Sequence, residues 1–138
     1  MTATMKYREE LSTKTAYIQQ AIQNVVDPPV EMQGEMYEIS LELDSIAFLF
    51  SGTPAKASWE EVPPEIMPLS NRLGEIVWVS WSSTSSPTES QKVNYNILME
   101  ELPAILEDLE SIHNKLGVAE QELDKMKAPH TPGRVPKF

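Results

Sequence analysis

The residues Ser86–Lys127, SPTESQKVNYNILMEELPAILEDLESIHNKLGVAEQELDKMK, decide the fold of this chain. Apolar side chains recur there at alternating spacings of three and four, without a change of phase. They are Tyr95, Leu98, Leu102, Ile105, Leu109, Ile112, Leu116, Ala119, Leu123 and Met126. Such a heptad seam is typical of a long amphipathic helix that packs against other helices. The pattern predicts a helix over residues 87–127.

Local signals mark the start of this helix and disturb its middle. Ser86-Pro87-Thr88-Glu89 has the layout of a capping box, with Ser86 as the N-cap and Glu89 reaching back. Pro103 costs about 3 kcal/mol in a helix interior, and Gly117 costs roughly 1 kcal/mol. Because the seam keeps its phase through both, we predict a kink at Pro103 rather than a break. The helix would be on the order of 60 Å long.

Three shorter helices precede it, over residues 4–26, 28–51 and 64–82. Asp27 is predicted to cap the second helix, and Gly52 to end it. A short strand at 76–79 is the alternative within the third. Residues 128–138 contain three prolines and are predicted to form an extended tail. We therefore expect one all-α domain over residues 1–138, an antiparallel four-helix bundle with a long, kinked C-terminal helix.

The long seam predicts an interface. Three helices of about half its length cover only part of it, so a further surface has to cover the rest. A second copy in a dimer, a fold-back near Gly117 or another domain would serve. Arg134 in the tail could pair with a carboxylate on a neighbouring domain. The candidate interface residues are Ile112, Leu116, Ala119, Leu123 and Met126 of the seam, with Thr131 and Arg134 of the tail.

Composition excludes several classes of function. The 138 residues carry a formal net charge of −10, which argues against binding to nucleic acid, since that binding relies on cationic side chains. There is no cysteine, and the five glycines form no phosphate-binding loop. No apolar run approaches the roughly 20 residues that span a bilayer. No signal peptide is recognisable, so a signal for export would lie upstream of this sequence.

The sequence predicts no catalytic residues, no cofactor and no metal. Glu110 and His113 have the Glu-x-x-His spacing of di-iron bundles, but such a site requires a second pair, and the other histidine, His130, lies in the tail. The carboxylates of the long helix fall mostly outside its seam and are predicted to be solvated. We therefore expect a structural or interaction module.

Trp59, Trp78 and Trp81 form a candidate aromatic surface. Tryptophans can make a platform for a sugar ring, which would suit a carbohydrate-associated accessory module of a glycoside hydrolase. Trp78 and Trp81 stand among Ile and Val residues, however, where indoles usually pack in a core or an interface. Both interpretations stay open at this point.

The second half of the chain resembles a known family. Asn71-Arg72-Leu73, the Ser/Thr-rich stretch 82–88, the heptad helix and the stretch 127–134, KAPHTPGR, resemble the C-terminal region of bacterial BNR-repeat proteins. These are sortilin-like β-propeller proteins, often labelled glycosyl hydrolases. The family's final motif commonly has Gly and Trp where this chain has Lys127 and His130. The resemblance implies a helical module after a β-propeller, in a periplasmic or extracellular protein, with the propeller as partner.

Overall fold

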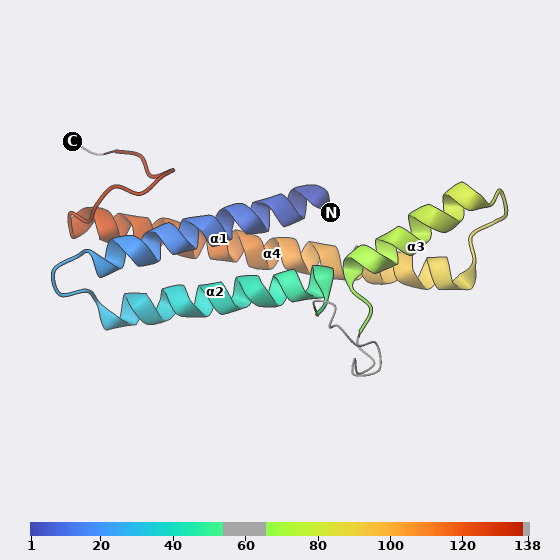
Figure 1. The fold of residues 1–138 in the computed structure, drawn as a ribbon, viewed down its shortest axis with the longest axis horizontal. Helices are drawn as coiled ribbons and strands as arrows, with labels where there is room; N and C mark the ends of the chain where they lie inside the picture. Colours follow the sequence, from blue (N-terminus) through green and yellow to red (C-terminus); the bar gives the residue numbers. More distant parts are fainter. Residues whose placement is uncertain (54–65, 137–138) are drawn as a thin grey trace. The chain divides into compact units, whose positions relative to one another are not determined.

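The computed structural model describes residues 1–53 and 66–136, and the described chain is all-α (Figure 1). Its helices are α1 (Thr2–Gln23), α2 (Val30–Ser51), α3 (Leu69–Ser82) and α4 (Glu89–Lys125). The predicted helical class is confirmed. The alternative of a strand at 76–79 is wrong, because these residues lie inside α3. As predicted, α4 continues through Pro103, while the kink stays a prediction.

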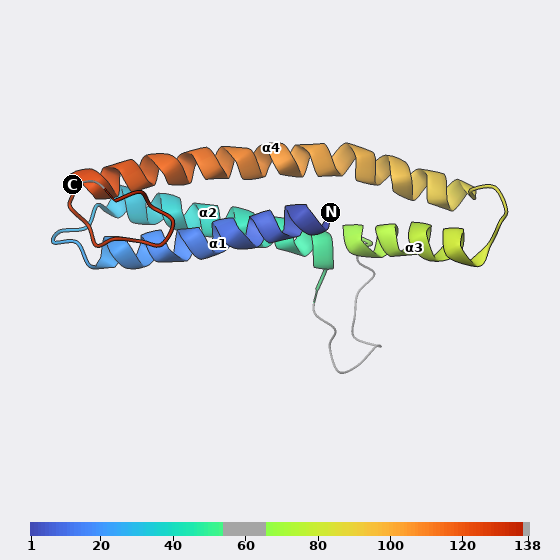
Figure 2. The ribbon, with the colours of Figure 1, turned by 90° about the horizontal axis from the view of Figure 1, so that it is seen from above.

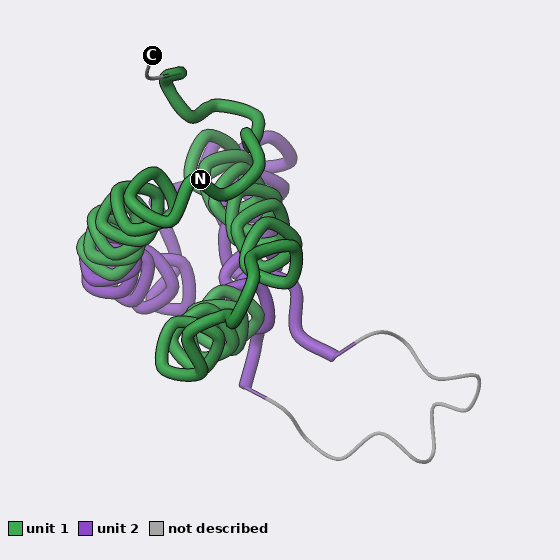
Figure 3. Tube along the Cα trace, turned by 90° about the vertical axis from the view of Figure 1, so that its left-hand side faces the viewer, with its two compact units in different colours: residues 1–44, 106–138 green, residues 45–105 purple. Residues whose placement is uncertain are grey.

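Where the periodicity predicts one domain, the chain forms two compact units (Figure 3). Unit 1 comprises Met1–Asp44 and Leu106–Phe138, and unit 2 comprises Ser45–Ile105. Both α2 and α4 contribute to each unit, because the division falls within these two helices.

Unit 1 is built from three helical segments. α1 lies beside the first part of α2 and the last part of α4, and α2 runs antiparallel to both (Figures 1 and 2). Each segment buries one stripe at helical spacing, which is the arrangement expected of amphipathic helices around a shared core. The stripes are Leu11, Thr15, Ile18 and Ile22 of α1, Met32, Met36, Ile39 and Leu43 of α2, and Leu109, Ile112, Leu116, Ala119 and Leu123 of α4.

Unit 2 consists of a helical hairpin, formed by α3 and the first part of α4, together with the last turns of α2. α3 and the first part of α4 run antiparallel, joined by residues 83–88 (Figure 2). Its core is small and partly polar. The buried side chains are Ile46 and Phe50 of α2, Leu69 of α3, and Gln91, Asn94, Leu98 and Ile105 of α4.

The end of α2 confirms the predicted role of Gly52. Its φ of 68° lies in the left-handed region, and its N–H donates to the Phe48 carbonyl at 2.7 Å. A Cβ at this position would lie 2.7 Å from Cγ of Pro68. Both the backbone conformation and the close approach of the Pro68 ring therefore require glycine here.

The predicted start of α2 is wrong. α2 begins at Val30, and the Pro29 carbonyl accepts the N–H of Gln33 at 3.2 Å. Asp27 has a φ of 60° and belongs to the preceding turn. Aspartate is one of the few residues that tolerate this left-handed conformation, which explains its presence at a turn as well as at a cap.

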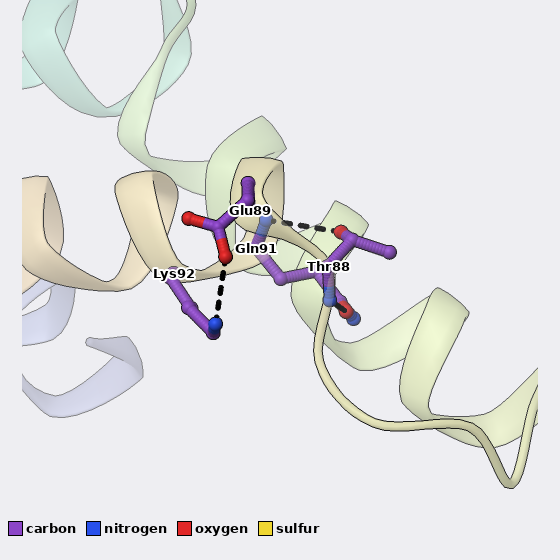
Figure 4. A network of polar contacts seen from close by, with 4 residues as sticks. All are labelled: Thr88, Glu89, Gln91 and Lys92. Atoms are coloured by element: carbon purple, nitrogen blue, oxygen red, sulfur yellow. Dashed lines mark hydrogen bonds and ion pairs between the residues drawn. The ribbon is translucent and has the colours of Figure 1, made fainter.

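The capping box of α4 lies two residues later than predicted (Figure 4). Thr88, not Ser86, is the capping residue: the Gln91 N–H donates to Thr88 Oγ1 at 3.3 Å, and the Thr88 N–H donates to Gln91 Oε1 at 2.8 Å. This is the reciprocal pattern of a capping box. Glu89, predicted to reach back, instead pairs with Lys92 Nζ at 2.7 Å. The helix therefore begins at Glu89.

Candidate functional site

The C-terminal part of the α4 seam, from Ile112 to Met126, is covered by other helices of unit 1. We call this part the distal seam. Ile112, Leu116 and Leu123 are fully buried, Ala119 is buried, and Met126 is partly buried. The prediction that these residues form a free interface is wrong, because α1 and α2 of the same chain cover them. Helix lengths alone do not reveal this cover, because the shorter helices pack along different parts of α4: α1 belongs to unit 1 and α3 to unit 2.

The tail is fixed to the end of α4 through Arg134. The Arg134 side chain is more than nine-tenths buried, and its Nε lies 3.2 Å from Oδ1 of Asp124. Its NH2 group donates to the carbonyls of Ala128, at 3.1 Å, and Pro129, at 2.9 Å. Thr131 is also buried, in a turn closed by the Arg134 N–H. Arg134 thus pairs with a carboxylate as predicted, but with one of its own unit rather than of a neighbouring domain.

A left-handed lysine connects α4 to this tail. Lys127 has a φ of 53°, its N–H donates to the Asp124 carbonyl at 3.2 Å, and the Ala128 N–H donates to the Leu123 carbonyl at 3.0 Å. These two bonds define a Schellman motif, whose left-handed position is usually glycine. A strained lysine therefore directs the tail back along unit 1.

The outer side of α3 carries a second apolar stripe. Gly74, Val77, Trp78 and Trp81 have the spacing i, i+3, i+4, i+7, which places them on one side of the helix. The exposed fractions of Val77, Trp78 and Trp81 are 48, 75 and 90 %. The sequence leaves Trp78 and Trp81 open between a packed position and an aromatic surface, and the structure exposes both side chains. We call these four residues the outer stripe.

Polar contacts fix the opposite side of α3 against α4. Asn94 is buried, accepts a hydrogen bond from Arg72 at 2.8 Å and donates one to Glu75 at 2.8 Å. Gln91, also buried, donates to the Ile76 carbonyl at 3.5 Å. Because buried amides require partners, these contacts set the rotation of α3 about its axis. They therefore keep the outer stripe turned away from α4.

Polar side chains outside this face do not assemble a reactive site among the described residues. His113 of the Glu-x-x-His pair packs near the ring of Tyr7, with centroids 6.2 Å apart. No three His, Asp or Glu side chains of the described chain converge as metal ligands would. A hollow of about 530 Å³ between α1 and the tail contains Lys14, whose ammonium group is 3.2 Å from Glu120.

The predicted aromatic surface is described in part. Trp78 and Trp81 lie one turn apart on α3, whereas Trp59 lies outside the described residues. Sequence reasoning missed Gly74 and Val77 as members of this surface. The spacing of Gly74 to Trp81 was the signal that could have identified them, since it repeats the helical pattern on the side opposite Leu69, Leu73 and Ile76.

Comparison of the chain with protein-family models, with curated proteins and with solved structures finds no match. Within the described residues, no helix is both long enough and apolar enough to cross a membrane. The outer stripe of α3 is therefore the feature on which a functional interpretation rests.

Proposed function

We propose that this chain is a non-catalytic helical interaction module that binds a protein partner through the outer stripe of α3. The observation that carries the proposal is the exposure of Trp78 and Trp81, at 75 and 90 %. Tryptophan is enriched in the energetically dominant centres of protein interfaces. An exposed apolar patch of this kind, bordered by polar residues, is typical of an interaction site.

The surroundings of the outer stripe support this role. A rigid helix presents the two indoles, and the hydrogen bonds of buried Asn94 with Arg72 and Glu75 hold that helix in one rotation. A preorganised surface loses little conformational entropy on binding. Unit 1, whose seam is covered by its own helices and whose tail is fixed by Arg134, serves as a stable support in this proposal.

The resemblance to BNR-repeat proteins suggests where such a module would act. In a protein of that type, the chain would follow a β-propeller, and the propeller would be a further partner of the module. Any hydrolase chemistry would then reside in the propeller rather than in this chain.

A carbohydrate-associated accessory module is the second candidate. Trp78 and Trp81 are exposed and one helical turn apart, so both indoles are accessible to a sugar ring. The convex surface of a helix is less suited to a sugar than a concave site, since ligand pockets are usually clefts. We therefore rank this function second.

Tryptophan fluorescence tests the two functions. A Trp59→Phe variant leaves Trp78 and Trp81 as the reporters, and cellohexaose, maltohexaose and an apolar dye, anilinonaphthalene sulfonate, are the probes. The proposal predicts that the dye binds and that Trp78→Ser combined with Trp81→Ser abolishes this binding, while the oligosaccharides change nothing. Saturable quenching by an oligosaccharide would favour the accessory module. Dye binding that survives both substitutions would overturn the proposed surface.

A further inference from the structure

We infer that the partner of the outer stripe is a second copy of this chain, which packs α3 against α3 in a two-fold symmetric dimer. This inference rests on the proposed function, because it names the occupant of the same surface. In a two-fold interface the same patch contacts itself, so the patch has to be self-complementary in charge and in shape. The outer stripe meets both conditions.

Charge favours a second copy. The chain has a net charge of −10, so two copies repel each other overall. From Ile76 to Thr88 the sequence contains no charged residue. The nearest acidic side chain on α3, Glu75, accepts a hydrogen bond from Asn94 of α4, so its carboxylate is directed toward α4. Two copies can therefore meet at the outer stripe without placing carboxylates opposite one another.

Gly74 leaves a gap in the outer stripe that gives it a self-complementary shape. Glycine in a helix interior is about 1 kcal/mol less favourable than alanine. Apart from the adjacent residues and the backbone of its own helix, no heavy atom lies within 4 Å of the place its Cβ would occupy. Nothing within the described chain therefore requires glycine there. A gap one turn before Trp78 would receive an indole from a second copy, and the same gap on that copy would receive Trp78 or Trp81 in return.

The exposed area is sufficient for a weak dimer. A buried tryptophan contributes up to about 250 Å², so the two indoles of each copy supply roughly 400 Å². Both copies together supply about 800 Å² from the indoles alone, against the 1,200–2,000 Å² of a stable interface. Val77 and the residues around the stripe would contribute the remainder. We expect a dissociation constant in the micromolar range.

Sedimentation velocity over a concentration series tests this inference on the full chain. The first variant combines Trp78→Ser with Trp81→Ser, and Tyr37→Ser, which replaces an exposed aromatic residue of α2, is its control. The second is Gly74→Ala, with Gly34→Ala as its control, since Gly34 is also helical with open space at its Cβ. Circular dichroism verifies that each variant is folded.

The inference predicts a monomer–dimer equilibrium that shifts toward the dimer as salt screens the net charge. Loss of the two indoles should raise the dissociation constant at least about 30-fold. Gly74→Ala should raise it about tenfold by filling the gap, and both controls should leave it unchanged. If the chain stays monomeric while Trp78 and Trp81 remain accessible to acrylamide, the inference of a dimer is wrong, but the proposed interaction surface still stands. Indoles shielded in that monomer would overturn both.

Discussion

Units 1 and 2 share the helix α4 and its continuous seam, yet they cover the apolar side chains differently. In unit 1 three helical segments surround the seam, and Leu109, Ile112 and Leu116 have no exposed surface. In unit 2 a hairpin leaves the outer stripe of α3 in water. The difference teaches that heptad periodicity identifies which side chains require cover, whereas the number of neighbouring helices decides whether the chain itself provides it.

The largest expected effect comes from opening the closed seam. Leu116→Ala removes a fully buried side chain between three helices and should lower the free energy of unfolding by about 3 kcal/mol. Trp81→Ala, at the exposed stripe, should change it by less than about 0.5 kcal/mol under conditions where the chain is monomeric. Urea denaturation measures both. Equal effects of the two substitutions would contradict the division into a closed and an open region.

Arg134→Ala should produce the next largest effect. The substitution removes the pairing with Asp124 and two hydrogen bonds to backbone carbonyls, so we expect a loss of about 2 kcal/mol. Limited proteolysis should then cleave the tail faster than in the parent chain. Lys125→Ala, which removes an exposed ion pair with Glu122, is the control and should have little effect. An Arg134→Ala chain as resistant as its parent would refute the attachment of the tail.

Thr88→Ala should weaken the start of α4 in unit 2 by about 1 kcal/mol, because it removes the capping oxygen that accepts the Gln91 N–H. Ser86→Ala is the matched control and should be neutral. Hydrogen exchange of the amides of residues 89–92 measures the effect locally. Faster exchange in Ser86→Ala than in Thr88→Ala would instead identify Ser86 as the N-cap, as the sequence alone predicts.

Lys127→Gly should give the smallest effect, a stabilisation of about 0.5 kcal/mol. The left-handed conformation costs a non-glycine residue roughly 1–2 kcal/mol, and the greater chain entropy of glycine offsets about 0.5–1 kcal/mol of that gain. Lys115→Gly, inside α4, should destabilise by about 1 kcal/mol. Urea denaturation measures whether each substitution raises or lowers the free energy of unfolding. A destabilised Lys127→Gly chain would contradict the Schellman motif at the end of α4.

The sequence predicted the helices well because their signals are local. The seam of α4 keeps its phase from Tyr95 to Met126, and Gly52 ends α2 through its own backbone conformation. The start of α4 was misplaced because Ser86 with Glu89 and Thr88 with Gln91 both satisfy the capping pattern. The contact of Gln91 with the Ile76 carbonyl favours the second, and a tertiary contact of this kind is not encoded in the spacing.

The candidate site was harder to predict because α3 is apolar on two sides. Leu69, Leu73 and Ile76 give one stripe, while Val77, Trp78 and Trp81 give the other, and composition does not indicate which of them meets α4. Asn94 decides this, since its bonds to Arg72 and Glu75 fix the rotation of α3. The distal seam was predicted to form an interface because periodicity shows that its side chains require cover but does not identify which helices provide it.

Hydroxyl-radical footprinting of the dilute, monomeric chain, read by mass spectrometry, tests the contrast between the two units most directly. Modification at each side chain is normalised to the urea-unfolded chain, so that intrinsic reactivity cancels. We expect Trp78 and Trp81 to react nearly as fast as in the unfolded chain, while Leu116 and Leu123 are strongly protected. Protected tryptophans together with reactive seam leucines would contradict it.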